Sequence, residues 1–270
     1  MALDKINNNS LHLRESIWGG EDRVEVWSGN QNQPPEWIAE FYRSLSTDER
    51  ARASRFKFER DRVHFITARG MLRYLLAAYM DIVPAEVQFR YNKQAKPHLS
   101  EEWSGLRFNI SHSGGKVLLA FALDRELGVD VEQIRPDFAT DDVAERFFSA
   151  LEVEKLRLLP KSAQARAFFN CWTRKEAFIK AIGEGLSCPL DKFDVTLAPE
   201  EPARLLATRI DGQPASNWSM QSLEVGTGYR AALVVQGHGW KLSLRKVGEI
   251  IRGCAGLWLS DKYLVGKWHD

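Results

Sequence analysis

The order of the elements expected along the chain constrains the fold most. Apolar residues recur at helical spacing over 61–80 and again over 163–182, which predicts two long helices with buried faces. Shorter helices and strands precede each long helix, and further strands follow it. Each half of the chain thus has the same order of elements. No repeat of residues accompanies this order, so a duplicated architecture rests on element order alone.

The expected strands and helix ends follow from local patterns. Ser46, with Glu49 three residues later, predicts the start of a short helix. Gly183 and Gly185 are expected to end the second long helix, because glycine accepts the left-handed conformation found there. Alternating or continuous apolar residues predict strands at 23–28, 87–91, 106–110, 117–123, 128–133, 193–197 and 230–235.

Composition excludes several classes of protein. The chain has 270 residues with a net charge of +1, so no overall charge favours nucleic acid as a partner. Cys171, Cys188 and Cys254 are far apart and have neither disulfide nor metal-ligand spacing. The longest apolar run, Val117 to Leu123, is too short to span a bilayer, and residues 1–20 lack the apolar core of a signal peptide. We therefore expect a cytoplasmic protein with reduced thiols and no membrane partner.

Two carboxylates share one face of an expected strand. Asp130 and Glu132 alternate with Val129 and Val131, so they point the same way. On an exposed strand this is ordinary charge patterning. The small apolar frame that Gly128 and the valines give favours a central strand, where two carboxylates must be solvated, paired or given a metal ion. Pairing and metal binding both remain open at this point.

Glu176 and Lys180 lie one turn apart on the second long helix. This spacing suits a surface ion pair worth about 0.3–0.5 kcal/mol. Lys175 weakens that interpretation, because it falls within the apolar stripe of the same helix. A lysine there either extends to the edge of the stripe or reaches a buried anion. Glu176 then lies at the border of the stripe, where the wall of a cleft is expected.

A polar segment rich in small residues, 109–115, is expected between two strands. Its glycines and hydroxyls would let backbone N–H groups approach a ligand closely, although a plain hairpin turn explains it equally well. The basic residues between Arg50 and Arg62 alternate with acidic ones, which favours a solvated face over a nucleic-acid surface. Arg69, in the first long helix, fits an exposed helical position.

Several of these segments carry the motifs of one family, in order and with fitting spacing between Leu45 and Thr196. The motifs are Ala95-Lys96-Pro97, Phe108-Asn109-Ile110-Ser111-His112-Ser113, Gly128-x-Asp130-x-Glu132, Arg146-Phe147-Phe148-Ser149 and Trp172-x-x-Lys175-Glu176-Ala177-Phe178-x-Lys180-x-x-Gly183-x-Gly185-Leu186. Taken together they resemble the 4′-phosphopantetheinyl transferases of the Sfp type. The run from Leu45 to Leu75 also resembles the cyanobacterial, heterocyst-glycolipid-associated branch of that family.

The resemblance implies a fold and a reaction. The fold is a pseudo-symmetric α+β monomer of two similar α/β halves, here 1–124 and 125–270, with the active site in the cleft between them. Such enzymes transfer the 4′-phosphopantetheine arm of coenzyme A to a serine of an apo acyl, peptidyl or polyketide carrier protein. They release adenosine 3′,5′-bisphosphate.

The resemblance also implies roles for individual residues. Asp130, Glu132 and Glu176 would hold Mg²⁺, with Glu176 as general base and Lys180 at the pyrophosphate. The expected coenzyme A contacts are Arg52, Arg69, Lys96, Ser111, His112, Lys175 and Lys180. Ala95 stands where the family has the glycine of a Gly-Lys-Pro motif, so the backbone around Lys96 is expected to differ. The alternatives are a catalytically idle scaffold that binds coenzyme A or carrier protein, and a metal-dependent pyrophosphohydrolase.

Overall fold

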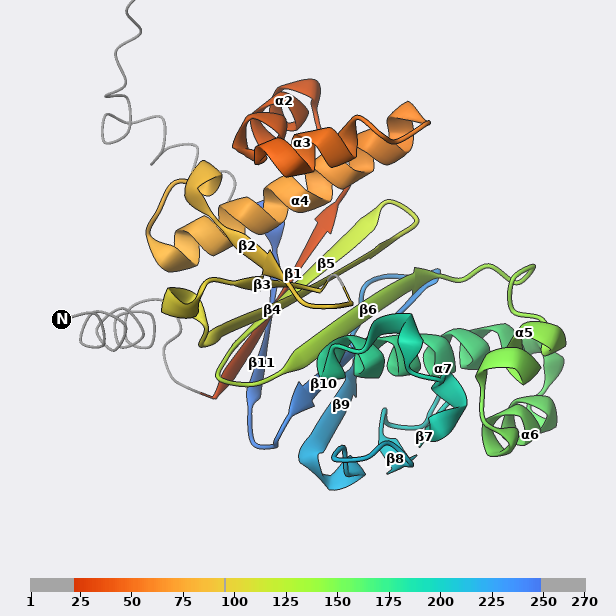
Figure 1. Cartoon of the computed structure of the whole chain (residues 1–270). Coiled ribbons are helices and arrows are strands. Elements are labelled where there is room, and N and C mark those ends of the chain that lie inside the picture. Colours follow the sequence, from red (N-terminus) through yellow and green to blue (C-terminus); the bar gives the residue numbers. More distant parts are fainter. Residues whose placement is uncertain (1–21, 95, 249–270) are drawn as a thin grey trace, which may run out of the picture. The chain divides into compact units, whose positions relative to one another are not determined.

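The computed structural model describes residues 22–94 and 96–248 and contains both helices and sheets (Figure 1). Its α-helices are α2 (Pro35–Ser44), α3 (Thr47–Ala53), α4 (Glu59–Met80), α5 (Asp141–Phe147), α6 (Ala150–Leu158) and α7 (Lys161–Ile182). Its strands are β1 (Arg23–Asn30), β2 (Phe89–Tyr91), β3 (Pro97–Leu99), β4 (Leu106–Ser113), β5 (Lys116–Leu123), β6 (Leu127–Gln133), β7 (Phe193–Val195), β8 (Leu205–Thr208), β9 (Trp218–Ser222), β10 (Tyr229–Gln236) and β11 (Lys241–Lys246). The expected α+β class is thereby confirmed.

The chain divides into two compact units. The first unit comprises the described residues 22–26, 88–94 and 96–243, and the second comprises 27–87 and 244–248. The boundary falls within β1 and β11, which belong to a four-stranded sheet in the order β11-β1-β5-β4. The expected halves 1–124 and 125–270 concern an internal duplication, which this division does not test, and they stay a prediction.

The ends of the helices follow the expected local signals. Helix α3 begins at Thr47, and the backbone N–H of the preceding Ser46 donates to Glu49 Oε2 over 3.0 Å. Helix α7 ends at Gly183, whose φ of 77° is the left-handed conformation that glycine adopts readily. Both helix ends predicted from the sequence are therefore confirmed.

The sheet that carries the acidic strand lies in the first unit. Strands β6, β10 and β9 form it in that order, and β10 pairs antiparallel with both neighbours. Helix α7 packs against β6 and β10 (Figure 1). Val129 and Val131 of β6 are buried in an apolar cluster with residues of β5 and β10. The side chains between them, including Asp130, point to the opposite face, as the alternation predicted.

Strand β6 is an edge strand, which corrects the expectation of a central one. Its free edge is nevertheless covered. The backbone N–H groups of Val129, Val131 and Gln133 donate to side-chain oxygens of β4 rather than to backbone carbonyls. An apolar sequence pattern indicates that a strand is buried, and it does not indicate whether another strand pairs with its backbone. Val129 and Val131 are buried although side chains, and not a strand backbone, cover this edge.

The polar segment 109–115 is mostly strand and ends in a hairpin turn, which is one of the two explanations that the sequence left open. Strand β4 continues to Ser113, and it pairs with β5 through to Ser113 opposite Lys116. Only Gly114 and Gly115 form the turn, both with positive φ. The backbone of this segment is therefore engaged in the sheet, and its side chains alternate between the two faces.

Other expectations from composition concern cysteines and membrane segments. Cys171 and Cys188 are free and buried, and Cys254 lies outside the described residues. No helix in the described part of the chain has both the length and the apolar character of a membrane span. Strand β11 follows Trp240, and the residues from 249 onward lie outside the described part of the chain.

Candidate active site

Helix α7 lies directly against strand β6 because Gly128 has no side chain. A Cβ atom at Gly128 would lie 2.1 Å from the carbonyl oxygen of Ala177 and 2.4 Å from the nitrogen of Ala181. Both atoms belong to the backbone of α7 and cannot swing aside. This close approach brings the last turns of α7 beside the acidic residues of β6.

Lys180 makes the contact that joins the two elements. Its Nζ atom lies 2.6 Å from Asp130 Oδ1, 3.0 Å from Ser111 Oγ and 3.4 Å from the carbonyl oxygen of Val129. Within residues 22–94 and 96–248, its ion pair is therefore with Asp130 and not with Glu176. The interpretation of Glu176 and Lys180 as a simple surface ion pair along one helix does not describe this arrangement.

Two serines of β4 orient the two carboxylates of β6. Ser111 Oγ donates to Asp130 Oδ1 over 2.8 Å and accepts the N–H of Val131. Ser113 Oγ donates to Glu132 Oε2 over 2.6 Å and accepts the N–H of Gln133. Each hydroxyl thus uses its proton on the carboxylate and a lone pair on the next backbone N–H. The carboxylates are held in place by hydrogen bonds as well as by their strand.

Ser111 uses its full hydrogen-bonding capacity within the protein in this structure, and its expected role at coenzyme A stays a prediction. A hydroxyl offers one proton and two lone pairs. Asp130 receives the proton, and the N–H of Val131 and the ammonium of Lys180 use the lone pairs. The Ser111 hydroxyl thereby links strand β4 to strand β6 and to helix α7 through hydrogen bonds.

Mutual repulsion and burial shape the titration of the acidic groups. Burial raises the pKa of Glu176 to about 7, and the negative charge of Asp130 adds to this while Lys180 opposes it. Burial also raises the pKa of Glu132, against the hydrogen bond from Ser113 that lowers it. Three carboxyl groups thus share the region between β6 and α7 with the Lys180 ammonium, and burial disfavours the charged form of two of them, Glu132 and Glu176.

The chemistry of these oxygens fits a hard cation. Asp130 Oδ2 is buried and has no hydrogen-bond partner within the described residues, so it is a carboxylate oxygen that lacks compensation. Carboxylate oxygens are the ligands that Mg²⁺ prefers. In the present arrangement, no three acidic, imidazole or thiol groups in the described part of the chain are grouped closely enough to hold a metal ion. Convergence of Asp130, Glu132 and Glu176 on one ion therefore stays a prediction.

Lys175 is engaged within the protein, and its expected contact with coenzyme A stays a prediction. The side chain is fully buried, and its Nζ atom lies 2.8 Å from Glu152 Oε2. It also donates to the carbonyl oxygens of Leu190 and Phe193 over 2.7 and 2.6 Å. These three partners use all the donors of an ammonium. Of the two alternatives left open by the sequence, Lys175 reaches a buried anion, and that anion is part of the protein.

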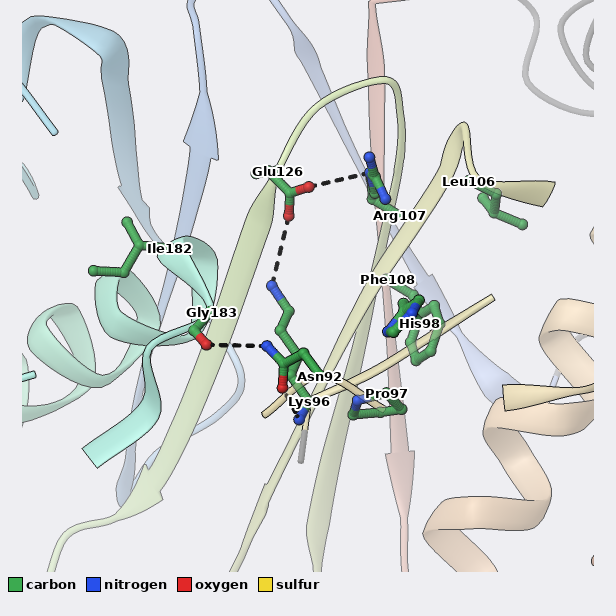
Figure 2. A pocket seen from close by; sticks show the side chains of 10 residues that line it. All are labelled: Asn92, Lys96, Pro97, His98, Leu106, Arg107, Phe108, Glu126, Ile182 and Gly183. Atoms are coloured by element: carbon green, nitrogen blue, oxygen red, sulfur yellow. Dashed lines mark hydrogen bonds and ion pairs between the residues drawn. The ribbon is translucent and has the colours of Figure 1, made fainter. Parts of the chain in front are cut away.

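Lys96 also binds the protein itself. Its Nζ atom lies 2.8 and 3.3 Å from the carbonyl oxygens of Lys180 and Ala181, at the end of α7. Glu126 Oε2 lies 3.6 Å away on another side, and the same carboxylate contacts Arg107 (Figure 2). Burial lowers the pKa of Lys96, against the effect of Glu126, which raises it.

The remaining expected coenzyme contacts are divided between the units. His112 is exposed on β4 of the first unit, and it points away from the face on which Ser111 and Ser113 meet β6. Arg52 and Arg69 belong to the second unit. Arg69 is buried with its Nε atom bound to Glu49, whereas Arg52 is exposed and lies over the ring of Phe65. Their roles toward coenzyme A stay predictions.

Three residues of this region were not predicted as site residues. Ser113 holds Glu132, Asn109 accepts the N–H of Val129, and Asn92 donates to the carbonyl oxygen of Gly183. For the first two a signal exists in the sequence. The polar residues of β4 have the same two-residue spacing as the acidic residues of β6, which is what two strands lying side by side require. No comparable signal points to Asn92.

Comparison with known proteins identifies the family. Residues 126–234 match the profile of the 4′-phosphopantetheinyl transferase superfamily, and residues 27–123 match that of the 4′-phosphopantetheinyl transferase N-terminal region. The 4′-phosphopantetheinyl transferase HetI of Nostoc sp. strain PCC 7120 is 38% identical over 82% of this chain and 90% of its own length. The 4′-phosphopantetheinyl transferase Sfp of Bacillus subtilis strain 168 is 32% identical over 58% of this chain and 68% of its own.

A solved structure, the holo-[acyl-carrier-protein] synthase of Thermotoga maritima, matches 42% of this chain and 64% of its own. Its TM-score of 0.33 and identity of 19% are too low to carry an argument. The sequence similarities suffice: the chain belongs to the 4′-phosphopantetheinyl transferase superfamily, and it is an enzyme that transfers phosphopantetheine. Within that family it resembles HetI over most of its length, which confirms the branch expected from residues 45–75.

Proposed function

We propose that this enzyme moves the 4′-phosphopantetheine arm of coenzyme A to a serine of an apo carrier protein, using the residues between β6 and α7. The observation that carries the assignment to this site is the contact of Lys180 with Asp130, beside the buried oxygen of Asp130 that has no partner. A cation and a pyrophosphate are the two kinds of group that such a pair of charges accommodates.

The metal part of the proposal concerns three carboxylates. Asp130, Glu132 and Glu176 would hold Mg²⁺, in keeping with the uncompensated oxygen of Asp130 and the carboxyl groups that share this region. When bound, the ion would neutralise charge on the coenzyme A pyrophosphate. Ser111 and Ser113 would keep two of the carboxylates in position, because their hydroxyls already hold them.

The chemical part concerns Glu176 and Lys180. The serine oxygen of the carrier protein would attack the β-phosphorus of coenzyme A, and its proton would pass to the Glu176 carboxylate. The bond from that phosphorus to the bridging oxygen would break, and adenosine 3′,5′-bisphosphate would leave with the electron pair. Lys180 would stabilise the charge that develops on the leaving phosphate.

The substrate part concerns phosphate recognition. His112, Arg69 and Arg52 would contact phosphates of coenzyme A, chiefly the 3′-phosphate, as expected from the family motifs. Lys175 and Ser111 are left out of this set, because their donors and acceptors are already used within the protein. Acyl, peptidyl and polyketide carrier proteins remain open as acceptors. A monomer acting in the cytoplasm belongs to the same proposal.

The test is a transfer reaction followed by mass spectrometry. Purified enzyme, coenzyme A, Mg²⁺ and a panel of apo carrier proteins should give a pantetheine-sized mass gain on the carrier serine. Chelation of the metal with EDTA should abolish the gain, and excess Mg²⁺ should restore it. Asp130→Asn should remove transfer, whereas Asp211→Asn, which neutralises an exposed aspartate in a turn, should leave it intact.

Other outcomes would favour the alternatives. Release of adenosine 3′,5′-bisphosphate without any carrier protein would indicate a pyrophosphohydrolase. Binding of coenzyme A without reaction on any carrier of the panel would indicate an idle scaffold. The presence of all three carboxylates and Lys180 favours transfer over the scaffold.

A further inference from the structure

Lys180 lies in the last turn of α7, where a helix holds its own backbone least well. The last four carbonyl groups of a helix have no partner within it, and helix ends fray. Helix α7 ends at Ile182, so the backbone of Lys180 depends on contacts made from outside the helix. A side chain whose ammonium must lie 2.6 Å from Asp130 Oδ1 tolerates little movement of that turn.

Two side chains of the β2–β3 connection supply these contacts. Lys96 Nζ donates to the carbonyl oxygens of Lys180 and Ala181. Asn92 Nδ2 donates to the carbonyl oxygen of Gly183 over 3.2 Å (Figure 2). The same region packs closely on the helix end. A Cβ atom at Gly183 would lie 3.6 Å from Lys96 Cδ and 3.7 Å from Asn92 Nδ2. Three carbonyl groups at the end of α7 are thus satisfied by two neighbouring side chains.

Asn92 also shapes the backbone that presents Lys96. Its Oδ1 atom accepts the N–H groups of Gln94 and Lys96 over 3.0 and 2.8 Å, and its own N–H donates to the carbonyl oxygen of Lys96. One side chain therefore orders its own connection and binds the helix. An amide that receives two backbone N–H groups in this way is held in one orientation.

Charge favours the same arrangement. A cation at a helix C-terminus interacts favourably with the negative end of the helix dipole. Glu126 holds the Lys96 ammonium from another side, and Arg107 holds Glu126 in turn (Figure 2). Lys96 lines a cavity of about 250 Å³ with these residues and, together with Lys180, a second one of about 200 Å³.

We propose that Asn92 and Lys96 are positioning residues that clamp the last turn of α7 and so fix the Lys180 ammonium against Asp130. The inference rests on the proposed function in so far as Lys180 serves transfer. It gives Lys96 a role within the protein, and the first test below distinguishes this role from the coenzyme A contact expected from the sequence. Both clamp residues act through the backbone of α7.

The first test separates positioning from substrate contact. Lys96→Met keeps the apolar stem of the side chain and removes the ammonium. It should lower kcat by roughly tenfold, as a small misplacement of a catalytic group does, with the KM for coenzyme A changed less than about twofold. Lys96→Arg should restore most of kcat, because a guanidinium can donate to the same carbonyl groups. Lys93→Met removes an exposed lysine of the same connection and should change neither constant.

The second test reads the helix directly and needs no activity. In Lys96→Met and in Asn92→Ala, the backbone amides of residues 180–183 should exchange with solvent roughly tenfold faster than in the wild type, while those in the middle of α7 stay unchanged. If the wild type proves inactive and this exchange still accelerates, the clamp stands and the proposed function fails. If Lys96→Met does not fold, Asn92→Ala alone provides the amide-exchange test.

Two outcomes would overturn the clamp. A large rise in the KM for coenzyme A, with kcat and amide exchange unchanged, would make Lys96 a substrate contact. A full further loss of kcat on adding Lys96→Met to Lys180→Ala would also contradict the proposal, since a residue that acts through Lys180 has little left to affect once that side chain is gone.

Discussion

Asp130 is the residue on which the arrangement between β6 and α7 depends most. One of its oxygens receives Ser111 and Lys180, and the other is buried without a partner in the described part of the chain. A buried carboxylate that serves only stability usually has both oxygens hydrogen-bonded. The imbalance at Asp130 favours a ligand-binding role. It separates Asp130 from Glu152 of the same unit, which receives the N–H of Ser149, the N–H of Val195 and the ammonium of Lys175.

Glu176→Gln distinguishes chemistry from stability at the neighbouring position. If Glu176 served only a surface ion pair, the change would alter the free energy of unfolding by no more than about 0.5 kcal/mol and leave the rate unchanged. We expect the fold to be retained and kcat to fall by about 10²-fold or more, because the carboxylate accepts the proton of the attacking serine. Urea unfolding and single-turnover transfer measure the two effects separately. A folded variant with near-normal transfer would require another base.

Lys175→Met tests the assignment of that lysine to the protein interior. Removal of the ammonium leaves Glu152 buried without its charge partner, so the free energy of unfolding should fall by about 3–5 kcal/mol. The KM for coenzyme A should stay unchanged at a temperature where the variant is folded. The double variant Glu152→Gln/Lys175→Met should recover part of the stability, because it removes the unpaired charge. A raised KM with normal stability would return Lys175 to the coenzyme site.

At the scale of elements, the packing of α7 on β6 sets the geometry of the site. The sequence predicted the two elements but not the position of β6 in its sheet. The periodicity of residues 163–182 and the alternation of residues 128–133 predicted both elements and the faces they bury. The edge position of β6 was not predicted, since side chains of β4 cover its free edge and make it look like a central strand. An apolar pattern indicates that water is excluded from a strand. It does not indicate whether the backbone N–H groups of that strand bind side-chain oxygens or the carbonyl groups of a neighbouring strand.

Gly128→Ala tests the close approach of these two elements. The added methyl group would overlap the backbone of α7 at Ala177 and Ala181, so the helix must shift away from the strand. We expect a loss of about 1–3 kcal/mol in the free energy of unfolding and a fall in kcat well beyond what stability explains. The fall in kcat is measured by transfer kinetics under conditions where the variant is folded.

Gly105→Ala is the matched control for this prediction. The three atoms nearest to a Cβ atom at Gly105 all belong to the side chain of Asp124, with Oδ1 closest at 2.9 Å, and a side chain can rotate away more easily than backbone. The control should therefore keep both stability and kcat near the wild-type values. Equal effects of the two changes would mean that the spacing of α7 and β6 is not what positions Lys180.

At the scale of the whole molecule, the sequence identified the family, but it did not show which polar groups are engaged within the protein. Lys175, Ser111 and Lys96 are expected at coenzyme A from the sequence, and in the structure all three contact other groups of the protein. Their partners, Glu152, Asp130 and the carbonyl group of Lys180, are each at least 19 residues away. Which polar groups are already satisfied depends on such distant contacts, and local patterns do not contain them.

The 3′-phosphate of coenzyme A gives a test of two expected contacts. His112 is exposed on β4, and Arg69 is buried in α4. If both bind this phosphate, His112→Ala and Arg69→Ala should each raise the KM for coenzyme A by about tenfold, a loss typical of one charge-assisted hydrogen bond. With dephospho-coenzyme A, which lacks the phosphate, the same changes should have little effect. Steady-state kinetics with the two donors make the comparison.

Stability must be separated from binding in this comparison, because the two positions differ in their surroundings. His112 is exposed, so its replacement should leave Tm unchanged, whereas Arg69 neutralises the buried Glu49 and its loss should lower Tm. Arg73 Nε also lies 2.7 Å from Glu49 Oε2, so Arg69→Ala leaves that carboxylate one cation and a folded protein is expected. Arg43→Ala, which breaks an exposed pair within α2, controls for loss of positive charge. An equal rise in KM with coenzyme A and with dephospho-coenzyme A would contradict the assignment, since a contact to an absent phosphate contributes nothing. A rise in KM for His112→Ala alone would mean that Arg69 serves only the interior of the second unit.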